Sequence, residues 1–322
     1  MGHLRTSAEW RLFFGNWIPL ALMAAALALG LIATGFSLKP QGMLLPASAA
    51  AFFAALTVLC VRRATPRGAM LAFMFGTSAQ LLLVTVLMTP LTYIAAAADL
   101  PLQDGSLAAL DRMLGLDWRA YLAFVNERPW LISYLALGYA MIAWPVFGVP
   151  VLLGFTRNYR RLQQFTLAFA LALIATTAVS TMAPALGAYH GLGLTPGDYA
   201  HITPGGYLDQ LRDFPRVRDG SLRELDIVHL VGIITFPSFH AAAAVLYLWA
   251  FWAIWWMRPV ALLANGLMLA ATPIGGGHYF VDVFAGMGVA VLAIAAACWI
   301  GERVMRPTKR PAALPEGVAE AG

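Results

Sequence analysis

Long runs of apolar residues alternate with short polar segments along most of this 322-residue chain. Eight of the runs are long enough to cross a bilayer, because a membrane-spanning helix needs about 20 apolar residues, or a few fewer where the membrane thins. The eight predicted spans cover residues 12–38, 44–61, 68–96, 129–154, 163–187, 238–256, 259–275 and 279–300. Pro273 and the glycines at 275–277 are expected to shorten the seventh run. The pattern predicts an all-α polytopic membrane protein of about eight transmembrane helices.

The first run follows Arg5 and Arg11, as the apolar core of a signal peptide would. However, the run is too long for a signal-peptide core, and a second apolar run begins almost at once. We therefore favour a first helix that is retained.

Composition supports the same class. Hydrophobic residues make up 60% of the chain and charged residues 11%, and the mean hydropathy is +0.72. Soluble proteins are usually about 45–50% apolar and about 25% charged, so a soluble fold of this length could not bury so much apolar surface. Cys60 and Cys298 both lie in apolar stretches, which predicts small buried residues rather than a disulfide or a metal pair.

The basic residues lie in short clusters between the apolar runs, which indicates membrane topology rather than nucleic-acid binding, although the net charge is +5. If the N-terminus is cytoplasmic, thirteen of the 21 Lys and Arg residues fall on the cytoplasmic side. The positive-inside rule therefore predicts two cytoplasmic termini. The short loops favour a bacterial inner membrane, and the larger outside segments would face the periplasm.

Two outside segments have their own character. Residues 97–128 mix apolar and charged positions, which predicts one or two amphipathic helices on the membrane surface. Residues 188–236 are richer in Gly, Pro and charge and are expected to cover whatever opens on that face. The tail, residues 303–322, is predicted to be a disordered cytoplasmic segment.

Two short segments carry candidate chemistry. Residues 236–240 read Phe-Pro-Ser-Phe-His and begin the sixth span, and residues 275–282 read Gly-Gly-Gly-His-Tyr-Phe-Val-Asp and begin the eighth. One crossing out and one back separate them, so His240 and His278 are expected at the same membrane face. Asp282 follows His278 by four residues and could accept a hydrogen bond from one imidazole nitrogen, which would leave the other nitrogen nucleophilic.

The neighbouring residues suit a phosphate ligand. Ser238 can cap a helix or donate a hydrogen bond, and helix N-termini bind phosphate through their free N–H groups. The glycines before His278 let a ligand approach the backbone closely. Each part alone also fits a packing role or a simple helix break. Together they describe phosphoryl transfer through a covalent phosphohistidine, which needs neither a metal nor a cofactor.

At these residues the sequence resembles the type-2 phosphatidic acid phosphatase superfamily. Its Pro-Ser-x-His motif is matched by Pro237 to His240, and its His-x-x-x-Asp motif by His278 and Asp282. The strings around these residues look most like the inositol phosphorylceramide synthase and sphingomyelin synthase branch. The resemblance implies that His278 is the nucleophile, Asp282 its partner and His240 the general acid. It also implies a six-helix core within residues 68–302, preceded by two N-terminal helices in residues 1–67.

The sequence departs from the family pattern at its usual phosphate-binding cations. Ala271 and Thr272 replace the Ser-Arg pair upstream of the nucleophile, and the Lys-x6-Arg-Pro motif is absent from the outside segments. Arg218, Arg216 and Arg223, just before the sixth span, are therefore the candidate phosphate-binding cations. Further candidate substrate-binding residues are Ser238, Gly276, Gly277 and Tyr279.

Three functions are compatible with these residues. The first is a lipid phosphotransferase that moves a phospho-headgroup, such as phosphoinositol, from a phospholipid to a lipid alcohol. The second is a phosphatase acting on phosphatidate, phosphatidylglycerophosphate or a polyprenyl (di)phosphate. The third is a transporter or scaffold without chemistry, which the absence of a visible repeat disfavours. The missing cation motifs favour the transferase, and the sequence leaves the donor, the acceptor and the oligomeric state open.

Overall fold

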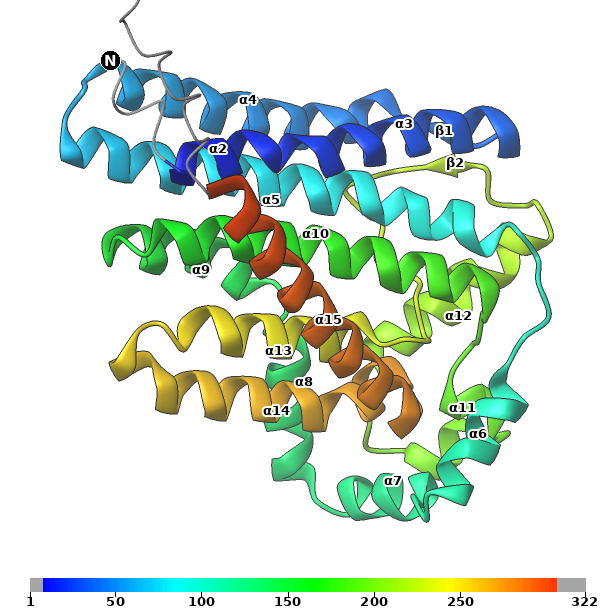
Figure 1. Cartoon of the computed structure of the whole chain (residues 1–322). Helices are drawn as coiled ribbons and strands as arrows, with labels where there is room; N and C mark the ends of the chain where they lie inside the picture. The colour runs from blue at the N-terminus through cyan, green and yellow to red at the C-terminus, as the bar shows by residue number, and fades with distance from the viewer. Residues whose placement is uncertain (1–7, 306–322) are drawn as a thin grey trace, which may run out of the picture.

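The computed structural model of the chain describes residues 8–305. Helices account for nearly all of its regular structure, and the two short strands form one small parallel sheet (Figure 1). In chain order the elements are α2 (Ala8–Gly15), α3 (Trp17–Thr34), β1 (Ser37–Leu38), α4 (Pro40–Arg62), α5 (Pro66–Ala96), α6 (Asp104–Met113), α7 (Trp118–Asn126), α8 (Pro129–Ala140), α9 (Trp144–Phe155), α10 (Tyr159–Met182), α11 (Ala188–Gly191), η1 (Pro196–Tyr199), α12 (Gly205–Arg218), β2 (Glu224–Leu225), α13 (Phe239–Phe251), η2 (Trp255–Met257), α14 (Arg258–Gly276) and α15 (Phe280–Met305).

Each of the eight predicted apolar runs is mainly helical, which confirms the predicted fold class, although the first ends at Thr34 and its last two residues, Ser37 and Leu38, form β1. Within residues 8–305, six helical stretches are long and apolar enough to cross a membrane, or seven if one bent pair of helices counts as a single span. The chain is therefore an all-α polytopic membrane protein. The seventh run extends to Gly276 and includes Pro273 inside its helix, so the residues expected to shorten it do not do so.

Two predicted spans differ from the structure. The fourth run, residues 129–154, is broken into α8 and α9, which meet at an angle of 61°. Pro145 in the first turn of α9 explains the break, because proline lacks the N–H that would bond the carbonyl four residues earlier, at the end of α8, and its ring crowds that carbonyl. The sixth run ends at Phe251 rather than at 256, and η2 reverses the chain direction before Pro259 opens α14.

The ends of other predicted segments are also shifted. Residues 183–187, expected to end the fifth span, lie beyond the end of α10 at Met182. The predicted disordered tail starts within α15, because residues 303–305 are helical. Its remaining residues, 306–322, lie outside the described part of the chain. The outside segment 97–128 contains two helices, α6 and α7, as its amphipathic pattern predicts.

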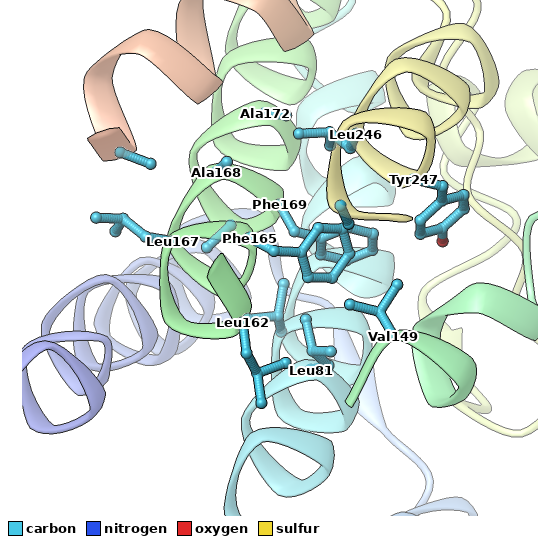
Figure 2. Packing of buried hydrophobic residues seen from close by; sticks show 14 of the residues in the cluster. Leu81, Val149, Leu162, Phe165, Leu167, Ala168, Phe169, Ala172, Leu246 and Tyr247 are labelled. Carbon is cyan, nitrogen blue, oxygen red and sulfur yellow. The ribbon is translucent and has the colours of Figure 1, made fainter. Parts of the chain in front are cut away.

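The core of the bundle lies between α5, α9, α10 and α13. Figure 2 shows Phe165 and Phe169 of α10 beside Leu81 of α5, Val149 of α9 and Tyr247 of α13. These side chains are at most 2% exposed. Helix α15 crosses the neighbouring helices obliquely, while α6, α7, α11 and α12 gather near one end of the bundle (Figure 1). The two candidate motifs lie at that end, where α13 and α15 begin.

Candidate active site

The structure brings the two predicted histidines to one cavity. His240 lies in the first turn of α13, and His278 lies in the short link between α14 and α15. Their ring centroids are 6.4 Å apart. Both residues line a cavity of about 580 Å³. Segments separated by one complete helical hairpin therefore meet at one site, as the sequence predicts.

Helix α13 begins beside this cavity. Ser238 is the N-cap, and its hydroxyl oxygen accepts a hydrogen bond from the Ala241 amide at 3.4 Å. Among residues 8–305, the amide N–H groups of Phe239 and His240 donate to no other group. Both residues line the cavity. Because free amides and the helix dipole attract anions, this end of α13 suits a phosphate oxygen.

Helix α15 differs, although the sequence suggested that both helix N-termini could bind phosphate. The Tyr279 amide donates to Asp282 Oδ2 at 2.9 Å. The next two amides, of Phe280 and Val281, donate to the two carboxylate oxygens of Asp111, each at 2.9 Å. The first N–H groups of α15 are thus occupied by the protein's own carboxylates, so of the two helix starts only α13 keeps amides free within residues 8–305.

A backbone carbonyl orients His278. Its Nδ1 lies 2.8 Å from Thr235 O and 3.5 Å from Asp282 Oδ2. A carbonyl oxygen can only accept, so Nδ1 carries the proton, and Nε2 of the neutral ring is left with its lone pair free. The 3.5 Å separation from Asp282 exceeds an ordinary hydrogen bond. The predicted His-Asp pair is therefore present, but Thr235 is the closer partner and was not predicted.

Gly276 makes room beside the free nitrogen of His278. A Cβ at position 276 would lie 2.8 Å from His278 Nε2 and 2.8 Å from the hydroxyl oxygen of Tyr139. Gly276 also lines the cavity. The absence of a side chain at this position leaves space beside Nε2, whereas the close approach of a ligand to this glycine stays a prediction.

Tyr139 is a further site residue that the sequence did not indicate. Its ring stacks on His240, with centroids 3.9 Å apart and an interplanar angle of 11°. Gly206 and Gly275 pack against the same tyrosine, because a Cβ at either position would come within 2.6 Å of it. Three glycines from two segments thus make space for one aromatic ring, which holds the His240 imidazole in a defined plane.

The remaining predicted site residues point elsewhere. Gly277 ends α14 with a φ of 68°, and its carbonyl accepts from the Ala188 amide at 2.6 Å. The Tyr279 hydroxyl donates to Asp104 Oδ1 at 3.1 Å. Neither Gly277 nor Tyr279 lines the cavity that contains both histidines.

The three predicted arginines are also outside the cavity lining. Arg218 contacts the Asp99 carboxylate and the carbonyl of Leu100. Arg223 donates to the carbonyl of Val217 at 2.9 Å, and Arg216 is exposed. The structure does not bring these side chains together with the histidines.

A different arginine is linked to the cavity. Asp209 of α12 lines the cavity, and Arg212 Nη1 donates to Asp209 Oδ1 at 2.8 Å. Arg212 also bonds Asp213, whose other partner is the Tyr93 hydroxyl at 2.8 Å. Burial would raise the pKa of the Asp213 carboxyl, but the hydrogen bonds from Arg212 and Tyr93 hold it below its ordinary value. Arg212 itself does not line the cavity and is paired with two carboxylates, so it borders the site only through Asp209.

The rest of the cavity is mainly apolar. Met88, Val146, Phe169 and Leu173 line it, together with residues at the break between α8 and α9. At that break the Tyr247 hydroxyl donates to the Ile142 carbonyl at 2.8 Å. Irregular backbone inside a membrane is tolerated where it borders a cavity or is buried in protein, which fits this location.

An all-α membrane protein in which two histidines face one partly apolar cavity is suited to phosphoryl chemistry on a lipid. The family model of the PAP2 superfamily matches residues 105–296, which is more than half of the chain and includes both motifs. The chain therefore belongs to the PAP2 superfamily, whose members are generally phosphatases or phosphotransferases. No curated protein and no solved structure matched the chain.

Proposed function

We propose that this protein is a membrane lipid phosphotransferase that moves a phospho-headgroup from a phospholipid to a lipid alcohol. The observation that supports it most directly is the cavity in which His240 and the Nε2 side of His278 meet a mainly apolar lining. Such a cavity suits reactants that are both lipids. The inositol phosphorylceramide synthase-like branch indicated by the sequence is part of this proposal.

In the first step His278 Nε2 attacks phosphorus. A nitrogen–phosphorus bond forms as the bond from phosphorus to the leaving lipid oxygen breaks. Protonated His240 gives its proton to that oxygen, so a neutral alcohol departs. The 6.4 Å between the two rings leaves space for a phosphoryl group.

In the second step the acceptor alcohol reverses these roles. Neutral His240 takes the hydroxyl proton, the acceptor oxygen bonds to phosphorus, and the nitrogen–phosphorus bond breaks. His278 and protonated His240 are both regenerated. If water replaced the alcohol, the same intermediate would give the phosphatase reaction.

Charge on the phosphoryl oxygens requires donors that are already in place. The free amides of Phe239 and His240 serve this role at the N-terminus of α13. Arg212, beside Asp209, is the cation that we assign to the site, whereas Arg216, Arg218 and Arg223 remain sequence-based candidates. The Thr235 carbonyl and Asp282 keep the His278 ring oriented.

The test is incubation of detergent-purified protein with labelled phospholipids, with and without ceramide or diacylglycerol, beside His278→Ala and with a chelator in a parallel sample. We expect a new phospholipid that requires the acceptor and His278, at a rate about a thousandfold or more above the variant. Activity should survive chelation. Release of phosphate or phospho-headgroup without an acceptor would instead establish the phosphatase, and full activity in His278→Ala would overturn the phosphohistidine.

A further inference from the structure

The helical pair α6–α7, here called the outer hairpin, contacts the short link that carries His278. The indole N–H of Trp118 donates to the His278 carbonyl at 2.9 Å. Asp111 accepts from the Phe280 and Val281 amides, each at 2.9 Å. These contacts join residues 160 to 170 positions apart in the chain. A segment whose sequence predicts surface helices thus contacts the backbone at the proposed nucleophile.

Four consecutive residues are fixed in this way. The bonded groups are the carbonyl of His278 and the amides of Tyr279, Phe280 and Val281. Two of the three side chains that bond them, Trp118 and Asp111, belong to the outer hairpin. With these backbone groups held, the His278 ring has little freedom to shift relative to the cavity.

A third residue of the outer hairpin, Asp104, contacts the same link and a neighbouring loop. Asp104 accepts from the amides of Leu186 and Gly187, at 3.0 and 2.8 Å, and from the Tyr279 hydroxyl at 3.1 Å. The loop held by Asp104 in turn binds the end of α14, because the Ala188 amide donates to Gly277 O at 2.6 Å. Both sides of His278 are therefore anchored through the outer hairpin.

Burial makes this arrangement costly to build. Asp111 is 3% exposed and Asp104 is 6% exposed. Burial raises the pKa of the Asp111 carboxyl, and the two hydrogen bonds from α15 amides lower it only in part. A buried carboxylate without a hydrogen-bond partner is strongly disfavoured. A helix that only covered an apolar surface would therefore not carry two buried carboxylates. Their presence under α15 indicates a specific structural role.

We propose that Asp111 and Trp118 are positioning residues that set the location of the His278 ring for attack on phosphorus. The proposal rests on the function proposed above, because it assigns the contacts of the outer hairpin to the phosphohistidine step. It gives residues 104–126 a part in the reaction although none of them lines the cavity that contains the histidines.

The experiment compares Asp111→Asn and Trp118→Phe with the wild type. Asparagine keeps the size of the side chain but can accept only one of the two amide bonds well. Phenylalanine removes the indole N–H, although an aromatic ring still faces Tyr189, which Trp118 contacts edge-on with centroids 4.9 Å apart. A displacement near 1 Å can cost about a hundredfold in rate, so we expect kcat to fall about tenfold or more in each variant, with KM changed less than about threefold.

Matched controls separate positioning from folding. Asp198→Asn alters a carboxylate that accepts from Thr195 in the same outside region but does not contact the His278 link. Trp130→Phe alters an exposed tryptophan of α8. Both controls should keep the wild-type kcat. Turnover is expressed per folded molecule, from the monodisperse fraction in detergent, and the rate of phosphoenzyme formation is measured in a single turnover.

The outcomes are distinct. A fall in the rate of phosphoenzyme formation per folded molecule, with KM little changed, supports the proposal. Two results would overturn the positioning role while His278→Ala stayed inactive. One is a wild-type rate in both Asp111→Asn and Trp118→Phe, and the other is a loss explained fully by a smaller amount of folded protein. If His278→Ala kept wild-type turnover, the phosphohistidine itself would be wrong, and this inference would be overturned with it.

Discussion

Replacing Gly286 with alanine should separate the two helices that carry the candidate motifs. Gly286 of α15 faces the start of α13 so closely that a Cβ there would lie 2.1 Å from the Ser238 carbonyl oxygen. Ordinary carbon–oxygen contacts need about 3.3 Å, so the helices would have to part by roughly 1 Å. The Ser238 amide donates to Asp282 O at 3.0 Å at the same crossing, and this bond would lengthen with the gap.

The expected magnitude follows from this displacement. Overpacking costs about 1–3 kcal/mol, offset by about 1 kcal/mol because alanine favours the helix more than glycine. The catalytic effect should be larger, since His240 and His278 move relative to each other, and a shift of about 1 Å can cost about a hundredfold in rate.

Gly288→Ala is the matched control, because a Cβ at this position of the same helix would meet nothing within 4 Å. It receives the same gain in helix propensity without the contact, so it should be neutral or stabilising by up to about 1 kcal/mol. The assay is thermal unfolding in one detergent together with turnover of a labelled phospholipid. Equal unfolding temperatures and equal turnover in the two variants would refute the argument from close helix contact.

Two further predictions concern groups around His240 and the phosphate. Tyr139→Phe should keep the stacked ring and stay within about threefold of wild-type kcat, whereas Tyr139→Ala should lose about tenfold; equal losses in both would show that the hydroxyl, not the ring, matters. Arg212→Ala should raise KM about tenfold, because a charged hydrogen-bond donor leaves the edge of the cavity beside Asp209. Arg218→Ala should leave KM within about threefold, as that side chain contacts Asp99 instead. Steady-state kinetics of both variants test this, and a larger rise in KM for Arg218→Ala than for Arg212→Ala would contradict it.

The apolar pattern predicted the helices well because burial in lipid requires continuous apolar stretches. It did not predict the break between α8 and α9, although Pro145 lies inside the fourth run and was a usable signal. The early end of α13 at Phe251 has a weaker signal, since residues 252–256 are as apolar as the helix before them. Hydropathy measures solubility in lipid, and it does not register where the backbone turns.

At the site, the sequence predicted the contacts that depend on a short spacing along the chain. His278 and Asp282 are four residues apart, and the cap formed by Ser238 is a property of its own helix. Thr235 acts through a backbone carbonyl, which has no sequence signature. Tyr139 reaches His240 from another helix, so only the fold could reveal it.

The predicted arginines show where inference from position along the chain failed. Arg216, Arg218 and Arg223 precede the sixth span closely in sequence, which suggested proximity to its histidine. Their helix and the turn after it direct Arg218 to Asp99 and Arg223 to Val217. Nearness along the chain did not become nearness in space, because an irregular segment of about a dozen residues intervenes before His240.

The small parallel sheet links the N-terminal helices to the segment that precedes α13. Strand β1, between α3 and α4, pairs with β2 through Ser37 and Leu38, and the Lys39 amide donates to Leu225 O at 2.9 Å. The family match begins only at residue 105, so β1 lies outside it and β2 inside it. A truncated chain limited to the matched residues would expose an unpaired edge shortly before α13. The N-terminal helices are consequently tied to the segment that precedes α13, although the family match does not include them.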